Sequence, residues 1–134
     1  MEKKKKKIIK TLIEAYELAK IETKIGASCF SVFDKVDLFL RKNGYRMLHS
    51  LGHGIGKKVH ELPIIGIPKE KLKKFKNIEK IENLKKIKFE NGMVFILDPG
   101  IYIKNVGGCR IENTFLFWNN KLVQLTKARL LKFY

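Results

Sequence analysis

The hydrophobic positions divide the chain into a helical first third and a strand-rich last third. Over residues 4–23 apolar side chains recur at helical spacing with no glycine or proline among them, which predicts an amphipathic helix. A break at 24–28 is followed by a second helical pattern, which we expect Ser31 to cap with Asp34 three residues later. This second helix is expected to end at Asn43, just before a glycine.

The C-terminal third has the pattern of short strands. Apolar and β-branched residues fill 92–103 and 109–118, and they predict strands. The pair Asn119-Asn120 indicates a hairpin turn into a further strand near 122–125. The basic tail from Thr126 is expected to be either helical or frayed.

Residues 69–88 have an unusual period, because an apolar residue recurs at every third position. An α-helix turns about 100° per residue, so each three-residue step displaces the apolar stripe by about 60° around the axis. A single long helix would spread its apolar residues over most of its surface. We therefore expect either two short helices, broken near Asn77 or Asn83, or one helix that caps the core obliquely.

The composition is that of one globular domain. The chain has 134 residues, of which 45% are hydrophobic, and this is enough to bury a core. No apolar run reaches the length of a membrane span or of a secretory signal, so we expect no membrane partner. Cys29 and Cys109 lie far apart and give neither a disulfide framework nor a metal-type spacing. A reducing, cytoplasmic setting is the expectation that follows.

The charge is strongly positive and unevenly distributed. The net charge is +16, and residues 1–10 and 69–88 together carry +11 of it. Both segments owe their charge to lysine. The interpretation we favour is that these are solvated helix faces. The alternative is weak attachment to an acidic partner or to a nucleic acid such as RNA, by charge alone.

The histidines gather in one turn-rich stretch. His49, His53 and His60 are the three histidines of the chain, and they lie within the glycine-punctuated segment 45–63, which cannot form a regular helix. Histidine is the commonest metal ligand and transfers protons near neutral pH. The flanking glycines allow the backbone to approach closely and leave room for a ligand beside an imidazole ring.

Two carboxylates complete the candidate chemistry. Asp98 follows a strongly apolar strand, and Glu112 lies two residues after Arg110. Carboxylates that project from buried strands are costly unless they are paired or bound to metal. A salt bridge between Arg110 and Glu112 is one interpretation. Because residues two apart on a strand share a face, a joint site with the histidines fits equally well.

These residues belong to an ordered run of motifs, and the run resembles the creatinase/aminopeptidase, or pita-bread, family. The motifs are His49-x3-His53-Gly-x-Gly, Val59-His60-Glu61-x-Pro63, Gly92-Met-Val-Phe-x-x-Asp98-Pro-Gly-Ile-Tyr102 and Gly107-Gly-x-Arg110-Ile-Glu112. From about residue 8 to 126 the chain is similar to the C-terminal half of that family, and most similar to its Xaa-Pro aminopeptidase and dipeptidase branch.

The resemblance implies a fold. It is an α+β fold in which helices pack on a curved antiparallel sheet, half of a pita-bread domain. Residues 1–134 would then form a single truncated catalytic domain, with 69–88 as a basic insertion within it.

The resemblance also implies roles for the site residues. His53, Asp98 and Glu112 would be metal ligands, with Asp98 in the place of a glutamate. His60 and His49 would act in catalysis, and both would bind substrate together with Arg110. The implied substrate is a peptide with proline in the second position. Manganese, cobalt, iron or zinc would suit such mixed imidazole and carboxylate ligands, and a pair of such ions would activate a hydroxide.

The chain departs from the family pattern in two ways. Two further aspartate ligands of the family come from strands that precede the first helix, and the chain begins too late to contain them. Asp98 is also shorter than a glutamate by one carbon–carbon bond, about 1.5 Å. We therefore expect no peptide hydrolysis by the chain alone. Two partners are left open: a second chain that supplies the aspartates, and a second copy of this chain in a homodimer. The alternative is a degenerate remnant or a module that binds a peptide, a protein or RNA.

Overall fold

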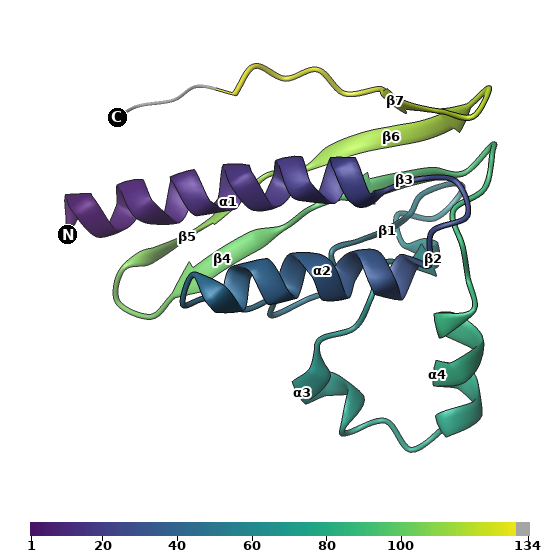
Figure 1. Ribbon diagram of the computed structural model, residues 1–134, viewed down its shortest axis with the longest axis horizontal. Coiled ribbons are helices and arrows are strands. Elements are labelled where there is room, and N and C mark those ends of the chain that lie inside the picture. Colours follow the sequence, from purple (N-terminus) through teal and green to yellow (C-terminus); the bar gives the residue numbers. More distant parts are fainter. Residues whose placement is uncertain (131–134) are drawn as a thin grey trace.

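Two helices pack on one face of an antiparallel sheet, and a small helical arm extends from the body (Figure 1). The computed structural model describes residues 1–130. The helices are α1 (Glu2–Glu22), α2 (Cys29–Lys42), α3 (Lys69–Leu72) and α4 (Ile78–Lys85). The strands are β1 (Gly52–Gly54), β2 (Glu61–Ile64), β3 (Val94–Leu97), β4 (Gly100–Ile103), β5 (Gly107–Arg110), β6 (Asn113–Trp118) and β7 (Lys121–Gln124).

Helix α1 follows the predicted amphipathic pattern. It buries Ile8, Leu12, Ala15 and Ala19 against the rest of the core, and their spacing of three or four residues places them on one face. Tyr16 lies on the same face, and its ring packs at 6.5 Å from that of Phe115 on β6. The first predicted helix is therefore confirmed, and its apolar face joins the helical layer to the sheet.

Helix α2 begins three residues earlier than predicted. Ser28 is its N-cap, and its Oγ accepts a hydrogen bond from the backbone N–H of Ser31 at 3.4 Å. The prediction that Ser31 caps the helix is wrong. Beginning the helix at Cys29 places Cys29 and Phe30, at 0% and 7% exposure, in a first turn that packs on the core. The end of the helix at Lys42 agrees with the prediction.

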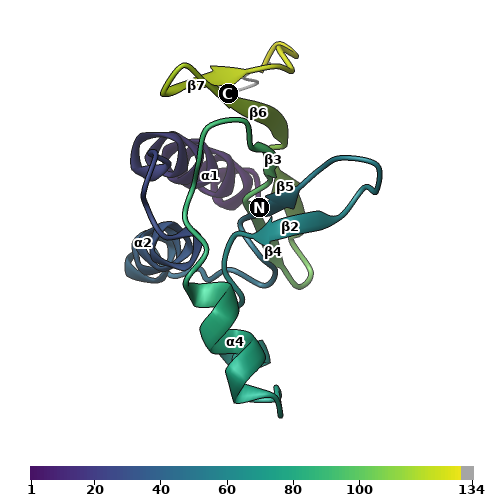
Figure 2. The same cartoon turned by 90° about the vertical axis from the view of Figure 1, so that its right-hand side faces the viewer.

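The strands form a five-stranded antiparallel sheet in the order β2-β1-β3-β6-β7, and β4 and β5 form a separate two-stranded ribbon. Seen from the end, α1 and α2 lie on one side and the strands on the other, and α4 extends below both (Figure 2). The predicted stretch 109–118 is divided between β5 and β6, with Ile111 and Glu112 in the connection. The predicted turn is confirmed, since Asn119 and Asn120 have φ of 50° and 60°, as a type I′ hairpin requires.

The close pairing of β1 with β3 depends on glycine. A Cβ at Gly52 would lie only 1.8 Å from the carbonyl oxygen of Ile96 on β3. Only a residue without a side chain can approach its neighbour so closely. In this register His53 lies opposite Ile96 on one side and Ile64 on the other. The glycines that flank His53 in the sequence thus place this histidine on an interior strand, between β2 and β3.

The segment 69–88 forms two short helices, with the break at Asn77. The Asn77 Oδ1 atom accepts a hydrogen bond from the backbone N–H of Lys80 at 3.0 Å and so caps α4. At the other end of the segment, Glu70 accepts hydrogen bonds from Arg41 at 3.1 Å and from Arg46 at 3.2 Å. The first of the two predicted alternatives, two short helices, is therefore confirmed.

The C-terminal tail has no regular structure over 125–130. The helical alternative predicted from Thr126 is therefore excluded as far as residue 130, and the prediction for residues 131–134 falls outside the described range. Within residues 1–130, none of the helices is both long enough and apolar enough to cross a membrane.

Candidate functional site

A cavity of about 910 Å³ opens beside β1 and β2. Five of the six predicted site residues are among those that line it, namely His49, His53, His60, Asp98 and Arg110. They come from separate elements: β1, the loops on either side of it, the end of β3 and the end of β5. The fold thus gathers side chains that lie up to 61 positions apart in the sequence.

Within residues 1–130, one ring nitrogen of His53 has no hydrogen-bond partner. Its Nδ1 atom lies 2.9 Å from the carbonyl oxygen of Gly54, and because a carbonyl can only accept, Nδ1 carries the hydrogen in the neutral ring. The lone pair is then on Nε2, the form in which histidine binds metal. The ring of His60 stands 4.4 Å away, centroid to centroid.

His49 is engaged at both ring nitrogens. Its Nδ1 atom lies 2.7 Å from the carbonyl oxygen of Ser50, so in the neutral ring Nε2 accepts a hydrogen bond from the hydroxyl of Tyr102 at 3.0 Å. His49 has no lone pair left for a metal, which suits the pocket-shaping role that the resemblance implies. Tyr102 was not among the predicted residues, although it is the tyrosine of the Gly-Ile-Tyr motif.

Asp98 is a buried carboxylate with an unsatisfied oxygen. Its side chain is at the end of β3, where the backbone N–H of the same residue donates to the carbonyl of Leu51 at 2.8 Å. The residue is 8% exposed, and within residues 1–130 its Oδ1 atom has no hydrogen-bond partner. Burial raises the pKa of Asp98 above its ordinary value, and the nearby His49 and His53 partly oppose that rise. A buried carboxylate oxygen without a partner, on a residue that lines a cavity, is typical of a site for a cation.

Glu112 is placed differently from the other candidates. It is not among the residues that line the cavity, and its Oε2 atom lies 3.7 Å from Nε of Arg110. Both side chains are about half exposed, at 47% and 52%. The salt bridge considered for this pair is therefore present, and it holds Glu112 beside the cavity rather than in its wall.

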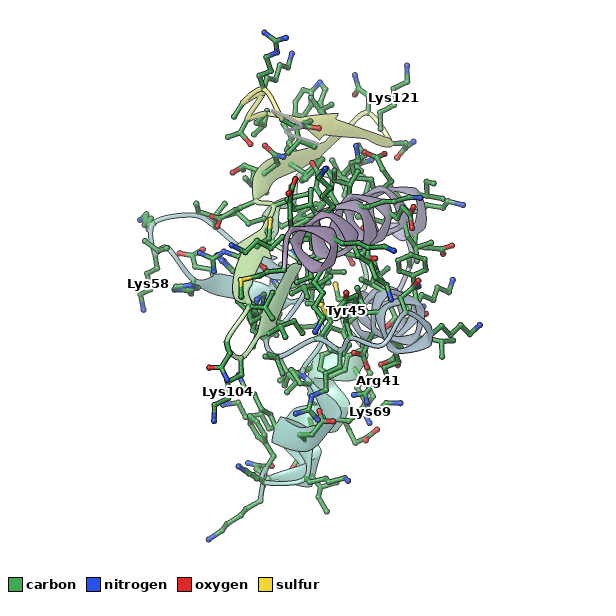
Figure 3. All side chains as sticks on the ribbon, turned by 90° about the vertical axis from the view of Figure 1, so that its left-hand side faces the viewer. Arg41, Tyr45, Lys58, Lys69, Lys104 and Lys121 are labelled. Carbon is green, nitrogen blue, oxygen red and sulfur yellow. The ribbon has the colours of Figure 1, made fainter. Side chains whose placement is uncertain are left out.

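Glu61 holds the loop that carries His60. Its Oε1 atom accepts the backbone N–H of Lys58 at 2.8 Å, and its Oε2 occupies the space that a side chain on Gly56 would need. Figure 3 shows Lys58 at the far end of this loop, directed away from the body of the molecule. The glutamate of the Val-His-Glu motif therefore closes the turn between β1 and β2.

These side chains are of the types that bind a divalent cation, but too few of them lie together. The free Nε2 of His53 and the unsatisfied Oδ1 of Asp98 are both suitable ligand atoms for such an ion. Within residues 1–130, however, no three side chains of histidine, cysteine, aspartate or glutamate are placed to hold one ion together. The described residues alone do not fit a complete metal site. The assignment of His53, Asp98 and Glu112 as a set of three ligands remains a prediction.

The known proteins that this chain is similar to are peptidases. Residues 1–117 match the model of Metallopeptidase family M24. The chain is 31% identical over 127 residues to an Xaa-Pro dipeptidase of Pyrococcus furiosus, covering 93% of this chain and 32% of that protein. An uncharacterised peptidase of Methanocaldococcus jannaschii is 32% identical over 125 residues, which are 93% of this chain and 33% of that one. The chain spans about a third of the length of the curated relatives it matches.

Solved structures agree with the sequence match. The prolidase from Pyrococcus horikoshii OT3 superposes with a TM-score of 0.78 at 31% identity, over 95% of this chain and 33% of that one. A methionine aminopeptidase from Rickettsia prowazekii, at 18% identity and a TM-score of 0.64, shares the fold. The expected α+β, pita-bread architecture is confirmed. With its family match over most of its length and its prolidase-like fold, the chain belongs to metallopeptidase family M24.

Proposed function

We propose that this chain forms part of an Xaa-Pro peptidase site and does not hydrolyse peptides by itself. The observation that carries the proposal is the ligand count, because residues 1–130 bring no three metal-binding side chains together. The relatives named Xaa-Pro dipeptidase and prolidase support the class of substrate, a peptide with proline in the second position. Metallopeptidase family M24 supports dependence on a divalent metal.

The chain's own residues would bind and orient the peptide. His60 is exposed at the mouth of the cavity, within reach of a substrate carbonyl. Arg110 is half exposed and can pair with a substrate carboxylate while Glu112 neutralises part of its charge. His49, fixed by Tyr102, would shape the wall between them. His53, Asp98 and Glu112 would contribute ligand atoms to a metal site, and further carboxylates would have to come from outside residues 1–130.

The proposal is tested with the purified chain, excess manganese or cobalt, and an Xaa-Pro dipeptide. We expect no hydrolysis above the background set by a His53→Ala variant. We also expect fewer than two tightly bound ions per chain, measured by isothermal titration. If the lone chain hydrolyses the dipeptide and His53→Ala abolishes that activity, the proposal is wrong. Activity that appears only with a second, aspartate-bearing chain or on dimerisation would identify the missing part.

A second candidate is a non-catalytic peptide-binding module. The cavity of about 910 Å³ supports it, since that volume can accept a short peptide whether or not a metal is held. In this case the proline dipeptide binds, Arg110→Ala weakens that binding, and no pairing with another chain gives hydrolysis. Hydrolysis under any pairing excludes the module and favours the divided enzyme.

A further inference from the structure

The segment 69–88, called here the lysine arm, presents positive charge that its own acids do not balance. Its nine lysines are all exposed, and in the described part of the chain only Lys85 forms an ion pair, with Glu82 at 3.4 Å. Glu70 is already bound by Arg41 and Arg46, which belong to the body of the molecule. The arm therefore has eight lysines available to an external anion.

The arm also contains an open, shallow hollow. A cavity of about 590 Å³ lies along the segment that joins α3 to α4, and its walls are Lys71, Lys74, Phe75, Lys76, Asn77 and Lys80. No carboxylate is among these residues. The phenyl ring of Phe75 is 41% exposed. Four cationic side chains thus surround one accessible aromatic ring.

This combination selects among anionic partners. A free phosphate would use the lysines and leave the ring of Phe75 without a role. A lipid surface would need a continuous apolar helix face, but α3 has only 4 residues. Helix α4 turns Ile81 and Leu84 into the protein and leaves Ile78 as its one exposed apolar residue. A single strand of nucleic acid uses both features, because its bases stack on an aromatic ring and its phosphates follow the lysines.

We propose that the lysine arm is a binding site for single-stranded nucleic acid, with a base on Phe75 and the backbone along Lys71, Lys74, Lys76 and Lys80. This site is separate from the peptide cavity and does not depend on the proposed peptidase role. Its location also fits such a ligand, since α3 and α4 extend away from the body and leave the arm open to a long strand (Figure 1).

The test is fluorescence anisotropy of the full chain with a labelled 12-nucleotide single-stranded RNA. One variant carries K71E, K74E, K76E and K80E. A matched control carries K3E, K4E, K5E and K10E, which makes the same change in net charge on the exposed side of α1. Circular dichroism and thermal melting show that each variant is folded.

We expect the arm variant to bind at least a hundredfold more weakly, and the control to lose less than tenfold. The slope of log affinity against log salt should become shallower by about 3 in the arm variant, because each phosphate that a lysine neutralises on a single strand adds about 0.7 to that slope. Phe75→Leu should weaken binding on the order of tenfold with the salt slope unchanged, whereas Phe75→Tyr, which keeps a ring, should retain the wild-type affinity.

Three results would overturn the proposal. Equal losses in the arm variant and the α1 control would show attraction by net charge alone. Unchanged affinity in Phe75→Leu would remove the stacking site. Binding to vesicles of phosphatidylglycerol without binding to RNA would assign the arm to a lipid surface.

Discussion

At the scale of single residues, the carboxylate of Asp98 suits a metal site, but its burial destabilises the fold. It is 8% exposed, and its Oδ1 atom has no partner among residues 1–130. A buried charge left unsatisfied costs stability. In metal-free buffer at pH 8, we expect Asp98→Asn to raise the free energy of unfolding by about 1 kcal/mol, because the neutral amide is cheaper to bury. Urea denaturation with a chelator present measures this.

The matched control is Glu112→Gln, at a carboxylate that is about half exposed and 3.7 Å from Arg110. Exposed pairs of this kind contribute little, so the free energy of unfolding should change by less than about 0.5 kcal/mol. If Asp98→Asn is less stable than the wild type while the control is unchanged, Asp98 makes a favourable interaction in the fold and is not a waiting ligand. A gain in both variants would point to net charge instead.

At the scale of elements, the N-cap of α2 is Ser28, whereas the sequence pattern predicted Ser31. Ser28 accepts the backbone N–H of Ser31 at 3.4 Å, and its hydroxyl also donates to the carbonyl of Lys85 at 3.2 Å, joining α2 to the end of α4. We expect Ser28→Ala to lower the free energy of unfolding by about 1 kcal/mol. Ser31→Ala, in the exposed first turn, should change it by less than about 0.5 kcal/mol. Chemical denaturation of both variants compares the two serines directly, and an equal loss would contradict the assigned cap.

Periodicity explains why the main elements could be predicted. The spacing of apolar residues over 4–23 predicts one helix face, and the three-residue period of 69–88 left two alternatives, two short helices or one oblique helix. Both predictions used only local geometry. The helix over 4–23 and the first of the two alternatives agree with the structure. The cap of α2 could not be placed in this way, because Ser28 and Ser31 are both acceptable caps and only the burial of Cys29 decides between them.

The motifs pointed to the three histidines, Asp98 and Arg110, and these residues line one cavity. Their roles stay predictions, and their contacts could not be predicted from the sequence. The bond from Tyr102 to His49 spans 53 positions, and a contact of that range depends on how the β4–β5 ribbon lies beside the loop of His49. The separation of Glu112 from the cavity wall likewise follows from the break between β5 and β6, which the strand pattern did not show.

At the scale of the whole molecule, the charge of +16 acts on stability as well as on binding. Like charges on a compact chain repel one another, and salt screens that repulsion over about 10 Å at 0.1 M. Surface ion pairs such as Lys35–Glu22, at 2.7 Å, are screened too, but exposed pairs are each worth less than about 1 kcal/mol. The 29 basic residues outnumber the 13 acidic ones, so the repulsive terms should dominate.

We therefore expect the melting temperature to rise by about 4 °C between 10 mM and 500 mM sodium chloride, which corresponds to a gain on the order of 1 kcal/mol. Circular dichroism melts at constant pH measure the shift, and chloride avoids the general stabilisation that sulfate gives. The variant with K71E, K74E, K76E and K80E carries half the net charge of the wild type, so its melting temperature should depend less on salt. A melting temperature that falls with salt would mean that the surface ion pairs outweigh the repulsion, and that the lysines of α1 and of the arm cost the fold nothing.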